Sequence, residues 1–423
     1  MTVGLVSTYH NRGGAAIAAK RLLDGLEMAG VPCWMMTARG GGAHPAIKGP
    51  NSASGRLYSR AGPFLDKLWP LKLYPGRTTN EFSPALLMTG TRRRVEKLHS
   101  DVVHLHWVSD GFLPITAVPR FRSPVVWTLH DMWNITGGCH YTMGCERFLD
   151  GCGKCPQLGS MNDRDLSWFV WHRKRNYWGT MACTYVSPSR WLAAEAKRSP
   201  ILSEARVEVI PNGLDLSVFH PIDRREARRI LRWPERAFMV LFGASGGTRD
   251  PRKGFQLLSR ALEGMQTRST ECECALAVFG QSGESELANG RHPVYDLGTV
   301  HDEKTLCLAY SAADVFVAPS LQDNLPNTVV EALACGTPGV GFSVGGLPEI
   351  VKHRETGFLA KEGSVESLRE GILWAQGVKD SPSIREACRE TAERDFDLKL
   401  SAKRHLNLYE EIIEMARNSC GKR

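Results

Sequence analysis

The sequence predicts an α/β protein made of two doubly wound domains. Short runs rich in β-branched and aromatic residues alternate with helical stretches along the whole chain, and this alternation is typical of parallel sheets covered by helices. A chain of 423 residues also exceeds one ordinary hydrophobic core. We therefore expect a first domain over residues 1–218 and a second over residues 219–399, which begins with a linker at 219–222.

Ten strands are expected, each followed by a helical or irregular stretch. In the first domain they are residues 3–7, 102–106, 125–130, 183–187 and 207–210. In the second domain they are residues 239–242, 275–279, 294–297, 315–318 and 339–342. A last helix is expected over residues 400–416.

The composition is that of a soluble globular protein. Hydrophobic residues make up 42% and charged residues 23% of the chain. The sequence opens with a strand instead of a basic and apolar leader, and no apolar run approaches the roughly 18 residues that span a bilayer. We expect a cytoplasmic protein.

The positive charge is concentrated in the first domain. Residues 1–218 hold 26 Lys and Arg against 16 Asp and Glu, whereas the remainder holds 27 against 29. Basic clusters occur at residues 92–94, 173–175 and 56–72, and the last of these also carries Leu65, Leu68 and Trp69. These clusters could attract an anionic membrane surface, or they could be solvated helix faces. We do not expect a nucleic-acid partner.

Two acids stand eight positions apart in the segment 319–351. Asp323 lies in a loop that follows the apolar run 315–318, and Pro326 suits the first turn of a helix over residues 327–334, in which Glu331 lies. In open α/β sheets such loops lie at the carboxyl ends of strands, where ligands bind. The free N–H groups of the helix would face an anion. The alternative is an ordinary strand and helix with solvated acids.

This segment resembles the signature of the retaining glycosyltransferases of family 4, also described as glycosyl transferases group 1. The likeness rests on Asp323-x7-Glu331, followed by Ala-Leu-Ala-Cys-Gly-Thr-Pro and Gly-Gly-Leu-Pro-Glu-Ile-Val. The family usually has Glu-x7-Glu. The shorter acid, within Gln-Asp-Asn-Leu-Pro-Asn-Thr, is similar to a variant of bacterial exopolysaccharide and lipopolysaccharide transferases. The resemblance implies the GT-B fold, with two Rossmann-like domains facing each other across a cleft and the last helix returning to the first domain.

The resemblance also implies roles for residues of this segment. Glu331 would hold the nucleotide ribose, and Asp323 would face the donor sugar or its phosphate as a catalytic residue. Asn324 and Leu325, between them, are expected among the donor-binding residues.

Two further loops are candidates for binding a diphosphate. Gly13 and Gly14 follow the first strand and open a helix, which lets the backbone approach a phosphate or sugar. Arg252 and Lys253 precede another helix, where cations oppose the helix dipole and an anion would compensate them. By resemblance Lys253 contacts the donor diphosphate and is catalytic. Family members usually have an arginine six positions before this lysine, but Gly247 occupies that position here.

Arg249 or Arg252 could replace that missing arginine. The alternative for the basic pair at residues 252 and 253 is plain solvation.

His130 closes the strand 125–130 and begins an irregular segment. A neutral histidine at the carboxyl end of a strand can donate to a phosphate or sugar oxygen near pH 7, although a lone histidine is more often structural. By resemblance this histidine lies near the reacting carbon and is catalytic.

Four of the twelve cysteines, Cys139, Cys145, Cys152 and Cys155, lie within 17 residues. In a cytoplasmic protein disulfides are disfavoured, and a Cys-x2-Cys pair with two more thiols suits a structural zinc ion. His140 is a possible alternate ligand, and free thiols or a redox pair are the other interpretations. Four thiolates would close the coordination shell, so a catalytic metal is not expected. The segment resembles an insert of a subset of these transferases.

The expected function is transfer of a hexose from a nucleotide diphosphate sugar to a saccharide acceptor, in surface polysaccharide biosynthesis. The acceptor would be linked to polyprenyl pyrophosphate, and the enzyme would associate peripherally with the inner membrane. No cofactor is required for catalysis, since the Asp-x-Asp pairs at 163–165 and 395–397 lie in loop or helical contexts. The alternatives are a sugar phosphorylase or epimerase of the same fold, and a non-catalytic partner that binds saccharide or lipid.

Overall fold

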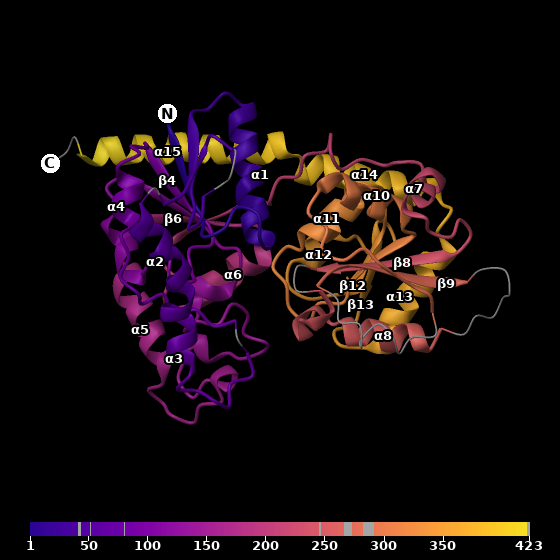
Figure 1. Ribbon diagram of the computed structural model, residues 1–423, viewed down its shortest axis with the longest axis horizontal. Helices are drawn as coiled ribbons and strands as arrows, with labels where there is room; N and C mark the ends of the chain where they lie inside the picture. Colours follow the sequence, from indigo (N-terminus) through magenta and orange to yellow (C-terminus); the bar gives the residue numbers. More distant parts are fainter. Residues whose placement is uncertain are drawn as a thin grey trace. The chain divides into compact units, whose positions relative to one another are not determined.

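The computed structural model describes residues 1–40, 44–50, 52–79, 81–244, 247–265, 273–281 and 292–420. The chain divides into two compact units, Met1–Pro211 with Ser401–Arg423, and Asn212–Leu400. Each unit is built on one parallel sheet with helices packed on it (Figure 1). The second unit begins at Asn212 instead of residue 219, because Leu214 is hydrogen-bonded through its backbone to Phe396 and to Leu398.

The sheet of the first unit has seven strands in the order β3-β2-β1-β4-β5-β6-β7, and every pair is parallel. The strands are β1 (Val3–Val6), β2 (Cys33–Met36), β3 (Ile47–Lys48), β4 (Val102–Leu105), β5 (Val125–Thr128), β6 (Cys183–Ser187) and β7 (Arg206–Val209). The sequence did not indicate β2 or β3. β2 reads Cys-Trp-Met-Met without a β-branched residue, and β3 has only two residues.

Seven α-helices belong wholly or partly to this unit in the part of the chain that is described. They are α1 (Gly14–Met28), α2 (Ala53–Pro63), α3 (Trp69–Leu71), α4 (Thr91–Glu96), α5 (Leu166–Trp178), α6 (Arg190–Arg198) and α15 (Leu398–Cys420). From Ser401 onward α15 packs on the first unit: Leu408, Tyr409 and Ile412 join the core formed by β1, β4 and α1. Tyr409 Oη lies 2.5 Å from Nδ1 of His104, and Glu411 pairs with Arg206 at 2.8 Å.

Acidification is expected to weaken the packing of α15, because its own His405 and the neighbouring His104 of β4 are buried where the helix packs on the first unit. Burial lowers the pKa of His405 to about 4, and burial together with the charges of His405 and His130 lowers the pKa of His104. The unfolded chain, with a histidine pKa of about 6.5, therefore binds more protons below that pH. The free energy of unfolding is highest above about pH 6.5 and falls as the pH drops toward 4. His405 alone accounts for up to about 3 kcal/mol of that loss.

The melting temperature between pH 7.5 and pH 4.5 tests this expectation. The variant His405→Gln should lose less stability over that range than the unmodified protein. Equal losses in the two proteins would contradict the assignment.

The sheet of the second unit has six strands in the order β10-β9-β8-β11-β12-β13, again all parallel. They are β8 (Phe238–Ala244), β9 (Cys274–Gly280), β10 (Val294–Asp296), β11 (Val315–Ala318), β12 (Gly339–Phe342) and β13 (Gly357–Ala360). The α-helices described here are α7 (Arg224–Leu231), α8 (Phe255–Glu263), α10 (Glu303–Ala312), α11 (Asn327–Ala334), α12 (Leu347–Ile350), α13 (Val365–Gly377) and α14 (Pro382–Phe396).

The strand order reverses between β8 and β11, which are neighbours. From β8 the chain proceeds outward to β9 and β10, then crosses back to β11 and proceeds outward in the other direction. This switch point is the place where open α/β sheets bind ligands, at the carboxyl ends of the strands.

Candidate active site

The loops that follow β8, β11 and β12 meet at the switch point of the second sheet. Leu321 donates its backbone N–H to Arg252 O at 2.8 Å, and Gly346 donates to Asp323 O at 3.2 Å. Two glycines permit this close approach: a Cβ on Gly254 (φ +71°) would lie 2.0 Å from Pro319 O, and one on Gly345 (φ +57°) would lie 1.8 Å from Asp323 O. The three loops are therefore fixed to one another through their backbones.

The carboxylate of Asp323 pairs with both predicted cations, Lys253 and Arg252. Its Oδ2 lies 2.6 Å from Lys253 Nζ and 3.7 Å from Nη1 of Arg252, and its Oδ1 accepts the N–H of Asn324 at 3.0 Å. Arg252 is fixed further by Asp250, at 3.1 Å, and by the carbonyl of Gln322, at 2.9 Å. The structure thus brings together residues that are 70 positions apart in the sequence.

Glu331 lies in the second turn of α11 and is buried, with 4% of its surface exposed. Its Oε2 accepts the hydroxyl of Tyr310, from α10, at 2.8 Å. Asn324 and Leu325 are also buried in the loop before α11. Tyr310 was not identified from the sequence, and neither was Asp250, because no spacing rule relates either residue to its partner.

The structure distinguishes the two arginines that could replace the family's missing one. Gly247 has a φ of +60°, and a Cβ there would lie 1.8 Å from Gln281 O, so this backbone excludes an arginine at that position. Arg249 is exposed at the end of the turn Gly247–Arg249. Arg252 is half-buried beside Asp323.

His130 lies in the first unit, just after β5, and is half-buried. Its Nε2 is 2.9 Å from Nδ1 of His106, and the two rings stack at a centroid distance of 5.2 Å. Burial lowers the pKa of His130 to about 4, against the opposing effect of Asp131. The imidazole is therefore neutral near pH 7, the form that the predicted hydrogen-bonding role requires.

Gly13 and Gly14 follow β1, at the start of α1. Gly13 has a φ of +83°, a conformation that favours glycine, and no other described part of the chain lies within 4 Å of a Cβ built on it. This glycine pair belongs to the first unit, as His130 does, and Asp323, Lys253 and Glu331 belong to the second.

The four clustered cysteines line one small cavity in the first unit, with a volume of about 20 Å³. All four are free thiols. His140 does not line that cavity. Its ring lies 2.7 Å from Asp131 Oδ2 and 2.9 Å from Ser83 Oγ, so the prediction that it could serve as an alternate ligand is wrong.

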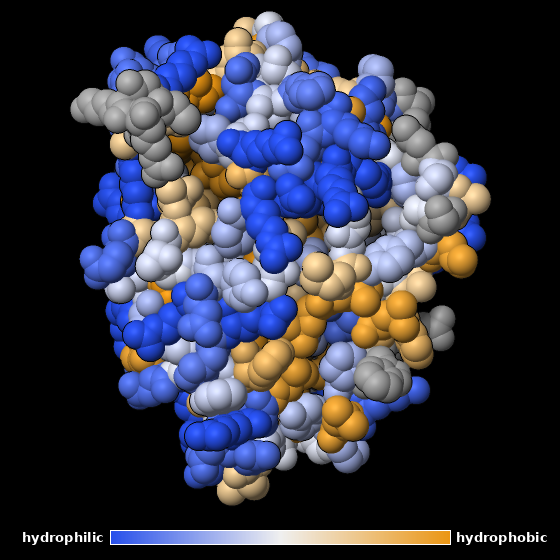
Figure 2. Space-filling model, turned by 90° about the vertical axis from the view of Figure 1, so that its left-hand side faces the viewer, coloured by the Kyte–Doolittle hydropathy of each residue, from blue (hydrophilic) through white to orange (hydrophobic). Residues whose placement is uncertain are grey.

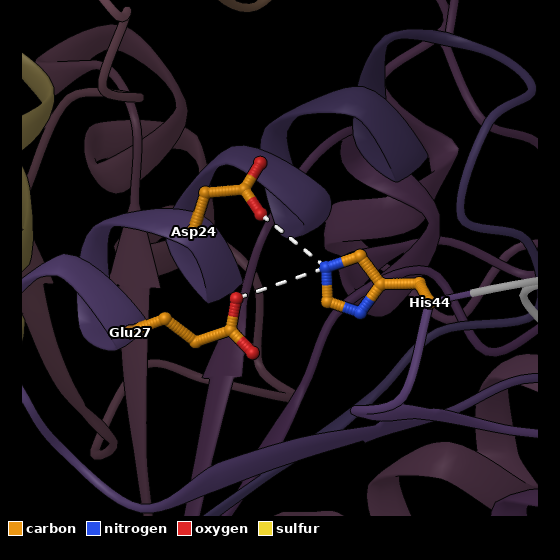
Figure 3. Close-up of side chains that lie close together, drawn as sticks. All are labelled: Asp24, Glu27 and His44. Atoms are coloured by element: carbon orange, nitrogen blue, oxygen red, sulfur yellow. Dashed lines mark ion pairs between the residues drawn. The ribbon is translucent and has the colours of Figure 1, made fainter.

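Among the described residues, one group of three possible metal ligands has all its ligand atoms within 4.8 Å: Asp24, Glu27 and His44 (Figure 3). Nε2 of His44 lies 4.0 Å from Asp24 Oδ1 and 3.7 Å from Glu27 Oε2. Asp24 is already paired with Lys20, whose Nζ lies 2.6 Å from Oδ2. We therefore interpret this group as surface ion pairs.

Comparison with known families covers most of the chain. The model described as Glycosyltransferase Family 4 matches residues 12–218, and the model described as Glycosyl transferases group 1 matches residues 239–376. A D-inositol 3-phosphate glycosyltransferase of Pseudarthrobacter chlorophenolicus is 25% identical over 366 residues, which cover 82% of this chain and 78% of that protein. The putative colanic acid biosynthesis glycosyl transferase WcaC of Escherichia coli K12 is 27% identical over 314 residues, covering 71% and 70%.

Among the solved structures that share this fold are the following three. Sucrose-phosphate synthase of Thermosynechococcus elongatus has a TM-score of 0.70 at 19% identity and covers 98% of this chain and 100% of its own. HepE of Anabaena, solved with UDP-glucose, has a TM-score of 0.63 at 16% identity and covers 99% and 100%. WaaG, from lipopolysaccharide biosynthesis, has a TM-score of 0.62 at 15% identity and covers 97% of this chain and 99% of its own. These likenesses confirm the predicted fold class.

Proposed function

This chain is a glycosyltransferase of the family 4 type, and we propose that it transfers a hexose from a nucleoside diphosphate sugar to a saccharide acceptor. The observation that carries this proposal is the meeting of Lys253, Arg252 and Asp323 at the switch point of the second sheet, beside the buried Glu331. A diphosphate needs fixed cations, and a ribose diol needs a fixed acceptor of hydrogen bonds; this edge of the sheet supplies both.

We assign Lys253 and Arg252 to the diphosphate. Without a donor, their charges are compensated by Asp323 at 2.6 Å and 3.7 Å. When a diphosphate binds, the cations would turn to its oxygens, and Asp323 would become available to hydroxyls of the donor sugar. HepE was solved with UDP-glucose, and a pneumococcal O-GlcNAc transferase of similar fold was solved with UDP and GlcNAc, which supports a uridine nucleotide donor.

We propose that the reaction retains the anomeric configuration by front-face substitution. The acceptor oxygen forms a bond to the anomeric carbon on the face from which the diphosphate departs, and the acceptor proton passes to the departing phosphate oxygen. Lys253 and Arg252 stabilise the negative charge that develops on the diphosphate. In the first unit, the neutral His130 would hydrogen-bond a sugar hydroxyl.

We further propose that the acceptor is a polyprenyl-pyrophosphate-linked saccharide of surface polysaccharide biosynthesis. The names of WcaC, from colanic acid biosynthesis, and of WaaG, from lipopolysaccharide biosynthesis, support this class of acceptor. A lipid-linked acceptor would require the enzyme to work at the inner membrane.

A product assay tests the reaction. The protein is incubated with UDP-, GDP- and ADP-hexoses and a lipid-linked saccharide, and the product is examined by NMR. We expect a new glycosidic bond with the configuration of the donor, and one nucleoside diphosphate released per bond. A product of inverted configuration would contradict retention. Phosphorolysis of a saccharide, or turnover without acceptor, would show a phosphorylase or an epimerase instead.

One surface of the first unit suits a membrane, which we call the α2–α3 face: Arg56, Leu57, Arg60, Phe64, Leu65, Lys72 and Leu73. Its apolar members are exposed, Leu57 by 70% and Leu73 by 77%, among three exposed cations. The side of the molecule shown in Figure 2 has apolar side chains gathered in one region, bordered by hydrophilic ones. The side chains of Leu68 and Trp69, which the sequence analysis placed on this surface, lie outside the described residues.

The other basic clusters are less suited to this role. Lys174 is fully buried, so residues 173–175 do not form the exposed cluster that the sequence suggested. Arg92 is paired with Glu96 at 2.6 Å. No helix in the described part of the chain is both long and apolar enough to span a bilayer.

Leu57→Asp is expected to weaken binding to vesicles that contain phosphatidylglycerol by about tenfold or more, because burial of one leucine contributes at least about 1.5 kcal/mol. Leu373→Asp is the matched control, since Leu373 is also exposed but lies on α13 of the second unit. Sedimentation with vesicles measures the binding. Failure of the unmodified protein to sediment, or equal weakening by both substitutions, would contradict a role for the α2–α3 face.

A further inference from the structure

The four cysteines of the first unit line one cavity, although they come from separate positions in an irregular segment. Cys139 forms an isolated β-bridge with Phe82, Cys145 follows a turn, and Cys152 and Cys155 flank a bend at Lys154. Together they line a cavity of about 20 Å³, a volume that holds about one water-sized group. The cavity therefore has room for one ion surrounded by four sulfur atoms.

A buried cation lies beside the same sulfurs. Lys174 is fully buried, and its Nζ lies 3.0 Å from Thr136 O and 3.8 Å from the centre of the Trp133 ring. Within the described residues it forms no ion pair with a carboxylate. Burial lowers the pKa of Lys174 to about 7, against the opposing effects of Cys139, Cys152 and Asp131. A buried charge without a compensating charge is costly, and a zinc ion with four thiolates would carry the net negative charge that compensates Lys174.

We propose that Cys139, Cys145, Cys152 and Cys155 bind one structural Zn²⁺ ion. Binding displaces the four thiol protons and completes a tetrahedral set, with sulfurs about 2.3 Å from zinc and so about 3.8 Å from one another. In this structure no three of the four sulfurs lie within 4.8 Å of one another. The thiol side chains would rotate into the cavity that they line. Four thiolates leave no open coordination position, so the ion orders the segment and takes no part in the reaction.

Ordering by zinc would extend to elements around the segment. Cys155 donates its N–H to Asp165 Oδ2 at 2.8 Å, and Asp165 caps α5. Ser83 donates its N–H to Gly138 O at 2.8 Å, and Met132 donates to His140 O at 2.9 Å. The segment thereby connects α5 and the loop after β5, in which His130 lies.

Metal analysis of the full-length protein, purified without a metal column, tests the proposal. We expect one zinc per chain in the unmodified protein and in Cys183→Ser, a buried cysteine of β6 that does not line the cavity. We expect loss of zinc in Cys152→Ser and in Cys155→Ser. Replacement of zinc by Co²⁺ in the unmodified protein should give the visible absorption of a tetrahedral thiolate site, a readout that does not depend on the folding of a variant.

Three results would overturn the proposal. They are a folded protein with far less than one zinc per chain, zinc that is retained in both cluster variants, and a Cys152–Cys155 disulfide in the mass spectrum of the protein as purified.

Discussion

Replacement of Lys253 by methionine is expected to lower kcat by about 100- to 1000-fold, the range measured when one group that stabilises developing charge is removed. Lys253 Nζ is the nearest cation to Asp323, at 2.6 Å, and in the proposed reaction it neutralises the departing diphosphate. Because the charge on that group grows as the bond breaks, the effect should fall on kcat more than on KM. Methionine keeps an unbranched stem, so the packing changes little.

Steady-state kinetics with a saturating acceptor measure this effect. A Lys253→Met protein that remains folded and whose kcat is within a few-fold of the unmodified value would contradict the catalytic role. A rise in KM alone would restrict Lys253 to ground-state binding of the donor.

Replacement of Glu331 by alanine is expected to weaken donor binding by about 10- to 150-fold. Hydrogen bonds to a charged group contribute about 1.5–3 kcal/mol, and each 1.4 kcal/mol changes affinity tenfold. The buried carboxylate accepts the hydroxyl of Tyr310 at 2.8 Å, which orients it. We propose that its other oxygen accepts hydrogen bonds from the ribose.

Tyr310→Phe is the control for this variant, because it removes the orienting hydroxyl and keeps the carboxylate. The hydroxyl acts on the donor only through the orientation of the carboxylate, so we expect a smaller effect in Tyr310→Phe, about a fivefold loss or about 1 kcal/mol. Calorimetric titration with the nucleoside diphosphate measures both variants. If Glu331→Ala is folded and binds the nucleotide as the unmodified protein does, Glu331 has no part in the site.

The sequence predicted best those elements whose signals are local. β11 (Val315–Ala318) and α11 (Asn327–Ala334) have the predicted bounds, because an apolar run closed by Pro319 and a helix that follows Pro326 leave few alternatives. β13 (Gly357–Ala360) was missed, because two of its four residues, Gly and Ala, favour strands poorly. Its position in the sheet depends on pairing with β12.

The site was predictable where a motif carried it and unpredictable where it depended on tertiary contacts. Asp323, Glu331 and Lys253 were identified from their motifs. Lys253 pairs with Asp323 because β8 and β11 are neighbours in the sheet. The sequence alone does not predict that these two strands are neighbours. For Lys174 the sequence pattern was misleading. A run of three cations predicts an exposed side chain, but Lys174 is buried against the ring of Trp133.

The central claim is that the switch point of the second sheet binds the donor diphosphate, and calorimetric titration of UDP and GDP into Arg252→Ala and Arg249→Ala tests it most directly. Both variants lose one arginine within the same loop, but Arg252 lies beside Asp323 and Arg249 is exposed. We predict about tenfold or greater loss of affinity in Arg252→Ala, and affinity within about twofold of the unmodified protein in Arg249→Ala. Unchanged binding in Arg252→Ala, or no binding of any nucleoside diphosphate by the folded protein, would contradict the claim.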